Sequence, residues 1–277
     1  MLRATLVAMS MAVSSAAFAQ ANADRGAYLV NAVMDCDACH TPAGPKGMER
    51  RFSGGPQTWA TPAYVVKGSN ITQDVETAIG TWSEADIVRA LTEGVRPNGV
   101  PLAPQMPYAF YRGLTKEDVN AVAAYVRSIP ALSNAVQPPE YKAAWTVQPV
   151  PGATASLPSV PTDPVQRGLY LANAAHCMEC HSNGADGRLD LVGNNGKGGN
   201  VMKGAYGTVV VANITSHPTK GLGAWSDDDI KNVLVKGVKP DGRPVAPPMA
   251  RQAFFSKMEP DDLNAMVAWV RSIPPAE

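Results

Sequence analysis

Two cysteines three positions apart, with a histidine directly behind the second, form a motif that occurs twice in this chain of 277 residues. The stretch MDCDACHTP holds the first copy and HCMECH holds the second. The motif residues are Cys36, Cys39 and His40 in the first copy, and Cys177, Cys180 and His181 in the second. The chain has 4 cysteines, so none is left to form a disulfide between distant loops. All the cysteines therefore serve the two motifs, and each half of the chain has to fold around whatever its motif binds.

The rest of the chain repeats along with this motif. RGAYLVNAVMDCDACH (25–40) is answered by RGLYLANAAHCMECH (167–181), and GVRPNGVPLAPQM (94–106) is answered by GVKPDGRPVAPPM (237–249). The stretch NIT, a Trp-Ser-x-x-Asp-Ile stretch and the stretch VRSIP also occur once in each half. A repeat of this length indicates two related domains in tandem.

The repeat predicts the domain boundaries and the fold class. We expect a first domain at 20–130, a proline-rich linker at 131–163 and a second domain at 164–277. Apolar residues at helical spacing follow a Ser-x-x-Asp N-cap signal in each repeat, and the last helix of each repeat stops at a proline. The expected fold class is all-α, with about three short helices and long Gly- and Pro-rich loops in each domain. Such a domain has little core of its own unless a large apolar group fills its centre.

The N-terminus has the pattern of a secretory signal peptide at residues 1–19. Arg3 precedes an apolar run, and Ala17, Phe18 and Ala19 form an A-x-A cleavage signal. The run is shorter than the roughly 20 apolar residues that span a bilayer, and no later run is long enough. We expect cleavage after Ala19, a periplasmic location, and membrane association only through partners. The 24 basic residues balance 24 acidic ones without any basic stretch, which argues against a nucleic-acid partner.

A thioredoxin-like dithiol, a zinc site and covalent haem attachment all use closely spaced cysteines. The dithiol needs a βαβ setting that the chain does not show, and zinc would have to gather cysteines from two complete repeats. In c-type haem attachment, the thiols form thioethers to the vinyl groups and the adjacent histidine becomes the proximal iron ligand. The same pattern at matching repeat positions favours this chemistry. We therefore predict two covalently bound haem c groups, each held by one copy of the motif.

A second axial ligand is expected opposite each histidine, since methionine is a common sixth ligand of electron-transfer haems and raises their potential. Met106 in APQM and Met249 in APPM occupy equivalent positions of the two repeats, in proline-stiffened loops ahead of the last helix. Met34 and Met178 flank or lie inside the attachment turns and cannot reach the far face of the haem. We predict Met106 and Met249 as the distal iron ligands.

With these motifs, the chain resembles a diheme member of the class I cytochrome c superfamily. Its NIT, Trp-Ser-x-x-Asp-Ile and AP-x-M stretches are similar to the cytochrome c subunit of bacterial membrane-bound alcohol and gluconate dehydrogenases, which carry three such domains instead of two. The resemblance implies the same eight haem residues as the motifs. It also implies that the first and last helices of each domain cross, through Gly26 and Tyr28 with Tyr125, and through Gly168 and Tyr170 with Trp269.

The resulting interpretation is an electron carrier and not an enzyme, with no catalytic residue assigned. It would accept electrons from a flavin, quinoprotein or molybdenum dehydrogenase and pass them to an oxidase, a quinone or a small cytochrome. The alternative is a diheme enzyme such as a peroxidase, which needs one iron open to peroxide. A thiosulfate-oxidising cytochrome needs a further cysteine that this chain lacks. A purely structural or sensory role is the least economical use of two covalent haems.

Overall fold

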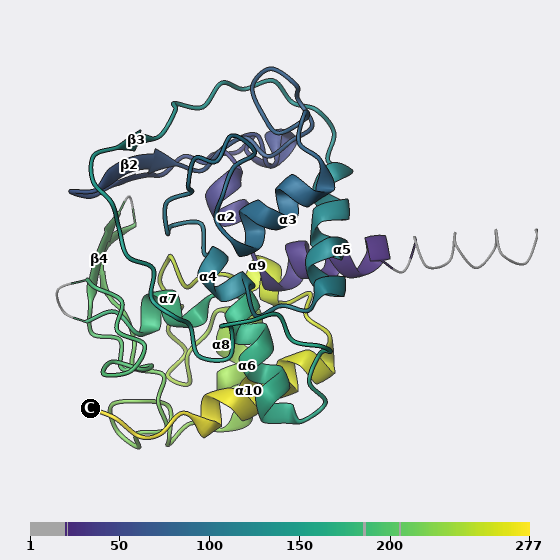
Figure 1. Cartoon of the computed structure of the whole chain (residues 1–277). Helices are drawn as coiled ribbons and strands as arrows, with labels where there is room; N and C mark the ends of the chain where they lie inside the picture. The colour runs from purple at the N-terminus through teal and green to yellow at the C-terminus, as the bar shows by residue number, and fades with distance from the viewer. Residues whose placement is uncertain (1–19, 21, 185–186, 205) are drawn as a thin grey trace, which may run out of the picture.

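The two repeats fold into matching sets of helices, the first lying above the second in Figure 1. The computed structural model describes residues 20, 22–184, 187–204 and 206–277. The predicted signal peptide at 1–19, with its cleavage site after Ala19, lies outside these residues. Within the described ranges, none of the helices combines the length and apolar character that crossing a membrane requires.

In each repeat, a first helix leads into the attachment turn and a last helix closes the domain. The first repeat is helical at 22–28 and continues as η1 (Leu29–Val33), α2 (Asp37–His40), η2 (Met48–Arg50), α3 (Glu84–Thr92), α4 (Tyr108–Tyr111) and α5 (Lys116–Arg127). The second repeat contains α6 (Pro164–Ala174), α7 (Cys177–His181), α8 (Asp227–Lys236), α9 (Gln252–Phe255) and α10 (Pro260–Ser272).

The predicted helix starts agree with the caps in the structure. Ser83 and Ser226 each accept a hydrogen bond from the backbone N–H of the aspartate three residues later, whose carboxylate accepts one in return. These reciprocal bonds satisfy backbone donors that have no partner inside the helix. Thr115 caps α5, and Pro260 is the first residue of α10.

Two small antiparallel sheets correct the all-α prediction. One sheet has the order β1 (Thr58–Ala60), β2 (Tyr64–Lys67) and β3 (Glu140–Tyr141), and the other pairs β4 (Val201–Gly204) with β5 (Gly207–Val210). Each sheet follows an attachment turn in sequence, at corresponding places of the two repeats. The strands are too short for the alternating pattern by which a strand is recognised in a sequence.

The proline-rich linker lies against both repeats. Its strand β3 pairs with β2, and the ring of Trp145 packs 5.3 Å from that of Tyr64 between centroids. Further along, Val150 and Ala153 are buried, and Gln148 Nε2 donates to the carbonyl of Leu189 in the second repeat at 2.6 Å. The linker therefore packs on the two repeats along its length.

Close helix crossings depend on two glycines. A Cβ built on Gly26 would lie 2.0 Å from the carbonyl oxygen of Ala121 in α5, and one built on Gly168 would lie 2.0 Å from that of Ala265 in α10. The first and last helices of each repeat therefore cross at these glycines, as the family resemblance implied. Only glycine allows the two backbones to approach this closely.

Replacing Gly26 by alanine is expected to destabilise the protein by about 1–3 kcal/mol, because the added methyl group must push α5 away. Urea unfolding of the haem-loaded protein measures the change. Ala23→Ser, at an exposed position of the same helix, serves as the control and should stay within about 0.5 kcal/mol of the native protein. Equal stability of Gly26→Ala and the control would contradict the crossing.

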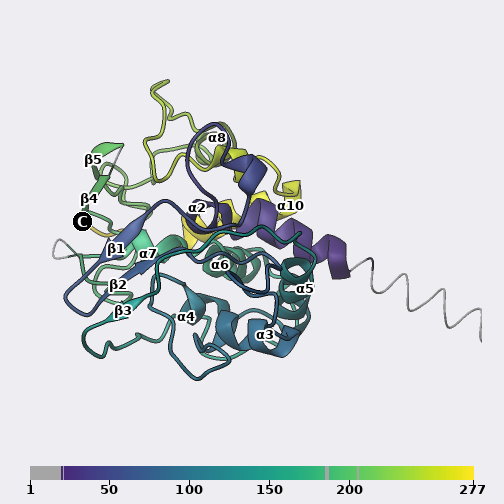
Figure 2. The same ribbon diagram turned by 90° about the horizontal axis from the view of Figure 1, so that it is seen from above.

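Reciprocal contacts join the two repeats. The hydroxyl of Tyr28 in the first repeat donates to Asp262 Oδ2 in the second at 2.6 Å, and the hydroxyl of Tyr170 in the second donates to Asp118 Oδ2 in the first at 2.6 Å. The helix contacts are exchanged in the same way, because α4 lies against α6 and α9 lies against η1. Figures 1 and 2 show α4 beside α6 from two directions. The two halves thus meet in an approximate two-fold arrangement, in which these contacts occur twice.

Each of these aspartates also binds an arginine of its own repeat. Arg25 Nε donates to Asp118 Oδ1 at 2.8 Å, and Arg167 Nε donates to Asp262 Oδ1 at 2.6 Å. The aspartates lie in the first turns of α5 and α10, where a negative charge is favourable, and they are only 4% and 1% exposed. Tyr28 and Tyr170 therefore connect the domains, whereas the family resemblance placed them in the crossing of their own helices.

Candidate cofactor-attachment sites

The two attachment turns have the same backbone. α2 and α7 each form one short turn, and the residue directly before the first cysteine of each motif has a left-handed backbone: φ is 50° at Asp35 and 44° at His176. Non-glycine residues seldom adopt this conformation, and here it occurs at the same place in both repeats. It ends the preceding helix and turns the two cysteines and the histidine onto one short helix.

The histidine rings are oriented by equivalent hydrogen bonds. His40 Nδ1 lies 2.7 Å from the carbonyl oxygen of Ser69, and His181 Nδ1 lies 2.8 Å from that of Ala212. A carbonyl only accepts, so Nδ1 carries the proton and Nε2 is the nitrogen left to bind a metal. Burial lowers the pKa of both imidazoles, which favours the neutral form that metal binding requires.

The cysteines are unlike those of a redox dithiol. All four are free and half-buried. Burial raises the pKa of the Cys39 and Cys180 thiols to about 12 and that of Cys177 to about 11, and it also raises the pKa of Cys36. Catalytic dithiols need a lowered thiol pKa. The zinc interpretation finds no support either, since the described residues contain no group of three or more His, Cys, Asp or Glu side chains that could hold a metal.

The loops that carry Met106 and Met249 have matching hydrogen bonds. Each methionine N–H donates to the carbonyl three residues earlier, at 3.0 Å for Met106 and 3.1 Å for Met249. Each methionine carbonyl accepts from the N–H two residues later, at 2.7 Å in both loops. Both side chains are half-buried and pack against the hydrophobic core that Cys36 and Cys177 also contact. Each loop therefore holds its methionine at the same core as the attachment turn.

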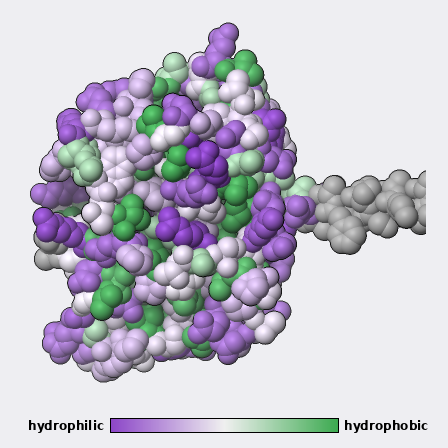
Figure 3. Space-filling view, in the orientation of Figure 1, coloured by the Kyte–Doolittle hydropathy of each residue, from purple (hydrophilic) through white to green (hydrophobic). Residues whose placement is uncertain are grey.

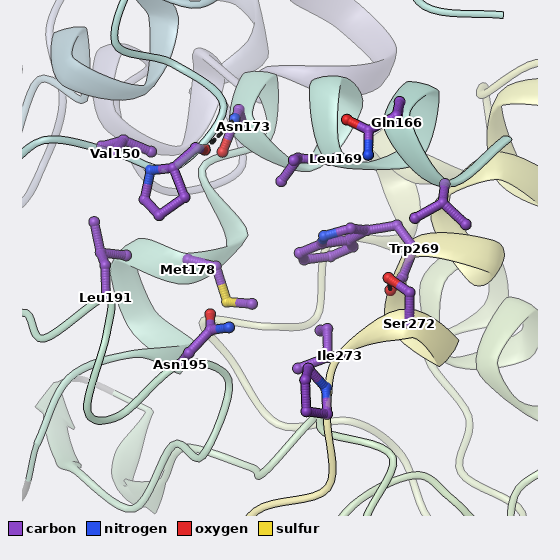
Figure 4. Close-up of a pocket in the computed structure, with 13 residues that line it drawn as sticks. Val150, Gln166, Leu169, Asn173, Met178, Leu191, Asn195, Trp269, Ser272 and Ile273 are labelled. Carbon is purple, nitrogen blue, oxygen red and sulfur yellow. Dashed lines mark hydrogen bonds between the residues drawn. The ribbon is translucent and has the colours of Figure 1, made fainter. Parts of the chain in front are cut away.

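Met178 has different surroundings from these two methionines. It points into a cavity of about 220 Å³, beside Trp269 and Ile273 (Figure 4). Leu169 of α6 lines the same cavity, so Met178 packs towards the helices behind its own turn. Met34 is 1% exposed and belongs to the core. Both residues thus occupy packing positions.

Buried oxygen atoms without a hydrogen-bond partner provide a test of whether these sites suit a large cofactor. Within the described residues these atoms are Asp35 Oδ1, Gln105 Oε1 and Asn200 Oδ1. Asp35 directly precedes the first cysteine, and Gln105 directly precedes Met106. A covalent haem fits the residues present, because each repeat offers two thiols on one turn, an oriented imidazole and a methionine loop.

Asn70 and Asn213 each bind the segment that follows the last helix of their own repeat. Asn70 Nδ2 donates to the carbonyl of Leu132 at 2.8 Å, and Asn213 Nδ2 donates to that of Ala276 at 2.7 Å. Both partners follow the last helix of their repeat. The tryptophans of the repeated Trp-Ser stretch are half-buried and pack against the core.

Sequence reasoning missed one charged pair that joins the two sites. Arg251 Nε in the second repeat lies 3.5 Å from Asp35 Oδ2 in the first, and the side chains are 17% and 1% exposed. Arg251 follows Met249 by two positions, where the first repeat has Tyr108 after Met106. The pair departs from the repeat, so the repeat could not reveal it. The repeated Tyr28 and Tyr170 were visible in the sequence, but their partners across the domains were not.

The comparisons with known proteins cover both repeats of the chain. A family model described as Cytochrome c matches residues 23–130 and 165–274. The fructose dehydrogenase cytochrome subunit of Gluconobacter japonicus is 34% identical over 265 residues, which is 90% of this chain and 52% of the relative. The alcohol dehydrogenase (quinone) cytochrome c subunit of Gluconobacter oxydans is 31% identical over 286 residues, which is 95% of this chain and 58% of the relative.

A diheme cytochrome c-type protein of Cereibacter sphaeroides is 28% identical over 257 residues, which is 87% of this chain and 83% of the relative. The chain spans about half the length of the two dehydrogenase subunits, and most of the length of the diheme protein.

Proposed function

The chain belongs to the cytochrome c family, and on that premise we propose that it is an exported diheme electron carrier that serves a dehydrogenase. Cytochrome c domains carry covalently bound haem c, and this chain has two such domains. The observation that best supports electron transfer is the duplicated constellation. Each repeat combines a Cys-x-x-Cys-His turn, a carbonyl that orients the histidine, and a methionine loop at the same core.

In this proposal, Cys36 and Cys39 hold the first haem, and Cys177 and Cys180 hold the second. The iron ligands are His40 and Met106 in the first domain, and His181 and Met249 in the second. When bound, the haem supplies one-electron chemistry, while the histidine and the methionine set its potential. Two six-coordinate irons leave no open position for a substrate. The residues at 20–130 and 164–277 form the two domains, with 131–163 between them.

The relatives support a dehydrogenase as electron donor, because two of them are cytochrome subunits of a fructose and an alcohol dehydrogenase. The acceptor would be an oxidase, a quinone or a small cytochrome. On the face drawn in Figure 3, hydrophobic side chains lie in small groups among hydrophilic ones. Such a surface suits brief encounters with a redox partner, since these bury little area. The signal peptide predicted at residues 1–19 supports a periplasmic location.

The low-temperature magnetic and optical spectra of the oxidised protein, purified from the periplasm, test the proposal. We expect two low-spin ferric irons, each with a sulfur-to-iron charge-transfer band. Mass spectrometry should show two covalently attached haems that persist after denaturation. One high-spin iron would contradict the carrier function and favour the peroxidase alternative, which peroxide turnover would then examine.

A further inference from the structure

The two attachment turns lie close together across the domain interface. Asp35, directly before the first turn, lies 3.5 Å from Arg251 of the second repeat, whose charge lowers the thiol pKa of Cys39 in the first turn and of Cys177 and Cys180 in the second. Glu179 of the second turn likewise acts on Cys39 of the first. The two-fold contacts between Tyr28 and Asp262 and between their counterparts fix this arrangement. The charges between the turns therefore act on both of the proposed haem sites.

The residues at the two equivalent positions before the turns differ in charge. Asp35 precedes the first turn and pairs with Arg251. His176 precedes the second turn, where its ring meets the ring of Tyr111 from the first repeat, with centroids 6.5 Å apart. Asp35 and His176 share a left-handed backbone, so the two-fold arrangement brings an acidic residue to one turn and a neutral or basic one to the other.

The charges of Asp37 and Asp35 distinguish the first turn from the second, because both raise the pKa of the Cys36 thiol beyond the effect of burial. The carboxylate of Asp35 adds to the effect of burial on Cys36 and Cys39 in the first turn. Arg251 and Glu179 each act on thiols of both turns. Asp37, also in the first turn, forms a forked ion pair with Arg51 of its own domain, whereas the partner of Asp35 comes from the other domain. Asp35 therefore places a negative charge beside the first haem site, with one oxygen unpartnered.

We propose that Asp35, held by Arg251, lowers the reduction potential of the first haem relative to the second and so directs electrons to the second domain. This inference rests on the proposed function. A buried carboxylate opposes the addition of an electron nearby, and the low dielectric of the interface strengthens that opposition. The step would transfer one electron from a reduced first haem to an oxidised second haem, with no bond broken and no proton moved.

The experiment measures how one electron is shared between the two haems in the half-reduced, haem-loaded protein. Ferric signals at low temperature are assigned to each domain with the variant Cys36→Ala/Cys39→Ala, which retains the second haem alone. In the native protein, we expect the second haem to be reduced first. Asp35→Asn should shift the equilibrium constant between the haems towards the first by about tenfold, which is 59 mV for a one-electron couple.

Asp35→Asn/Arg251→Gln is the second variant, because it removes both charges and leaves neither buried alone. We expect a shift in the same direction, since the charge of Arg251 acts on both sites. Asp241→Asn removes an exposed carboxylate of the second repeat and serves as the matched control, with an expected change below twofold. Equilibrium constants within twofold of the native value in both Asp35 variants, with two low-spin haems retained, would overturn the inference alone. A native protein with fewer than two low-spin haems would overturn the proposed function as well.

Discussion

Replacing Met249 by alanine is expected to abolish the sulfur-to-iron charge-transfer band of one haem and leave that of the other. The affected potential should fall by on the order of 0.1 V or more, because axial ligands set haem potentials over a range of about 0.8 V. Methionine stabilises ferrous iron, and water or a weaker ligand in its place does not. Optical spectra and a spectroelectrochemical titration of the haem-loaded protein measure both effects.

The equivalent change, Met106→Ala, should affect the other haem in the same way, since the two loops have matching hydrogen bonds. Met48→Ala is the matched control, because this methionine is 64% exposed and is not one of the proposed iron ligands. It should leave both bands and both potentials unchanged. Retention of two sulfur bands in Met106→Ala or Met249→Ala would refute the ligand assignment for that haem. A double variant that still shows one band would point to a different methionine.

The sequence predicted best those local structures that depend on residues a few positions apart in the chain. The Cys-x-x-Cys-His turns and the caps at Ser83 and Ser226 involve partners a few positions away, and the structure contains them as predicted. The sheets were missed because each strand has only two to four residues. β3 even comes from the proline-rich linker, where the sequence predicted no strand.

Contacts between the repeats were the least predictable part of the site. Tyr28 and Asp262 are 234 positions apart, and nothing local indicates that they meet. The repeat showed that both residues have counterparts, but it could not decide whether a tyrosine binds within its own domain or across to the other. Burial decides it here, because the two domains share one continuous hydrophobic core. The Asp35 and Arg251 pair was harder still, since it has no counterpart in the repeat.

The shared aspartates are expected to matter most for the stability of the paired domains. Asp262→Ala should lower the free energy of unfolding by about 3–5 kcal/mol, the cost typical of removing one partner from a buried ion pair. The change leaves Arg167 without its carboxylate and the Tyr28 hydroxyl without its acceptor. Since Arg167 is 32% exposed and can still reach water, the lower end of the range is expected. Urea unfolding of the haem-loaded protein measures the change.

Asp261→Ala is the matched control, because this neighbouring aspartate is exposed at the same helix start. It should change stability by less than about 0.5 kcal/mol. Tyr28→Phe/Tyr170→Phe separates the link between domains from the ion pairs, since it removes the two hydroxyls that cross the interface and keeps both arginines paired. We expect the free energy of unfolding to fall by about 1–3 kcal/mol for each buried aspartate oxygen that loses its tyrosine donor. If the tyrosine variant matches the native protein and Asp262→Ala alone is unstable, the aspartates stabilise each domain separately and the two-fold contact contributes little to holding the haem sites together.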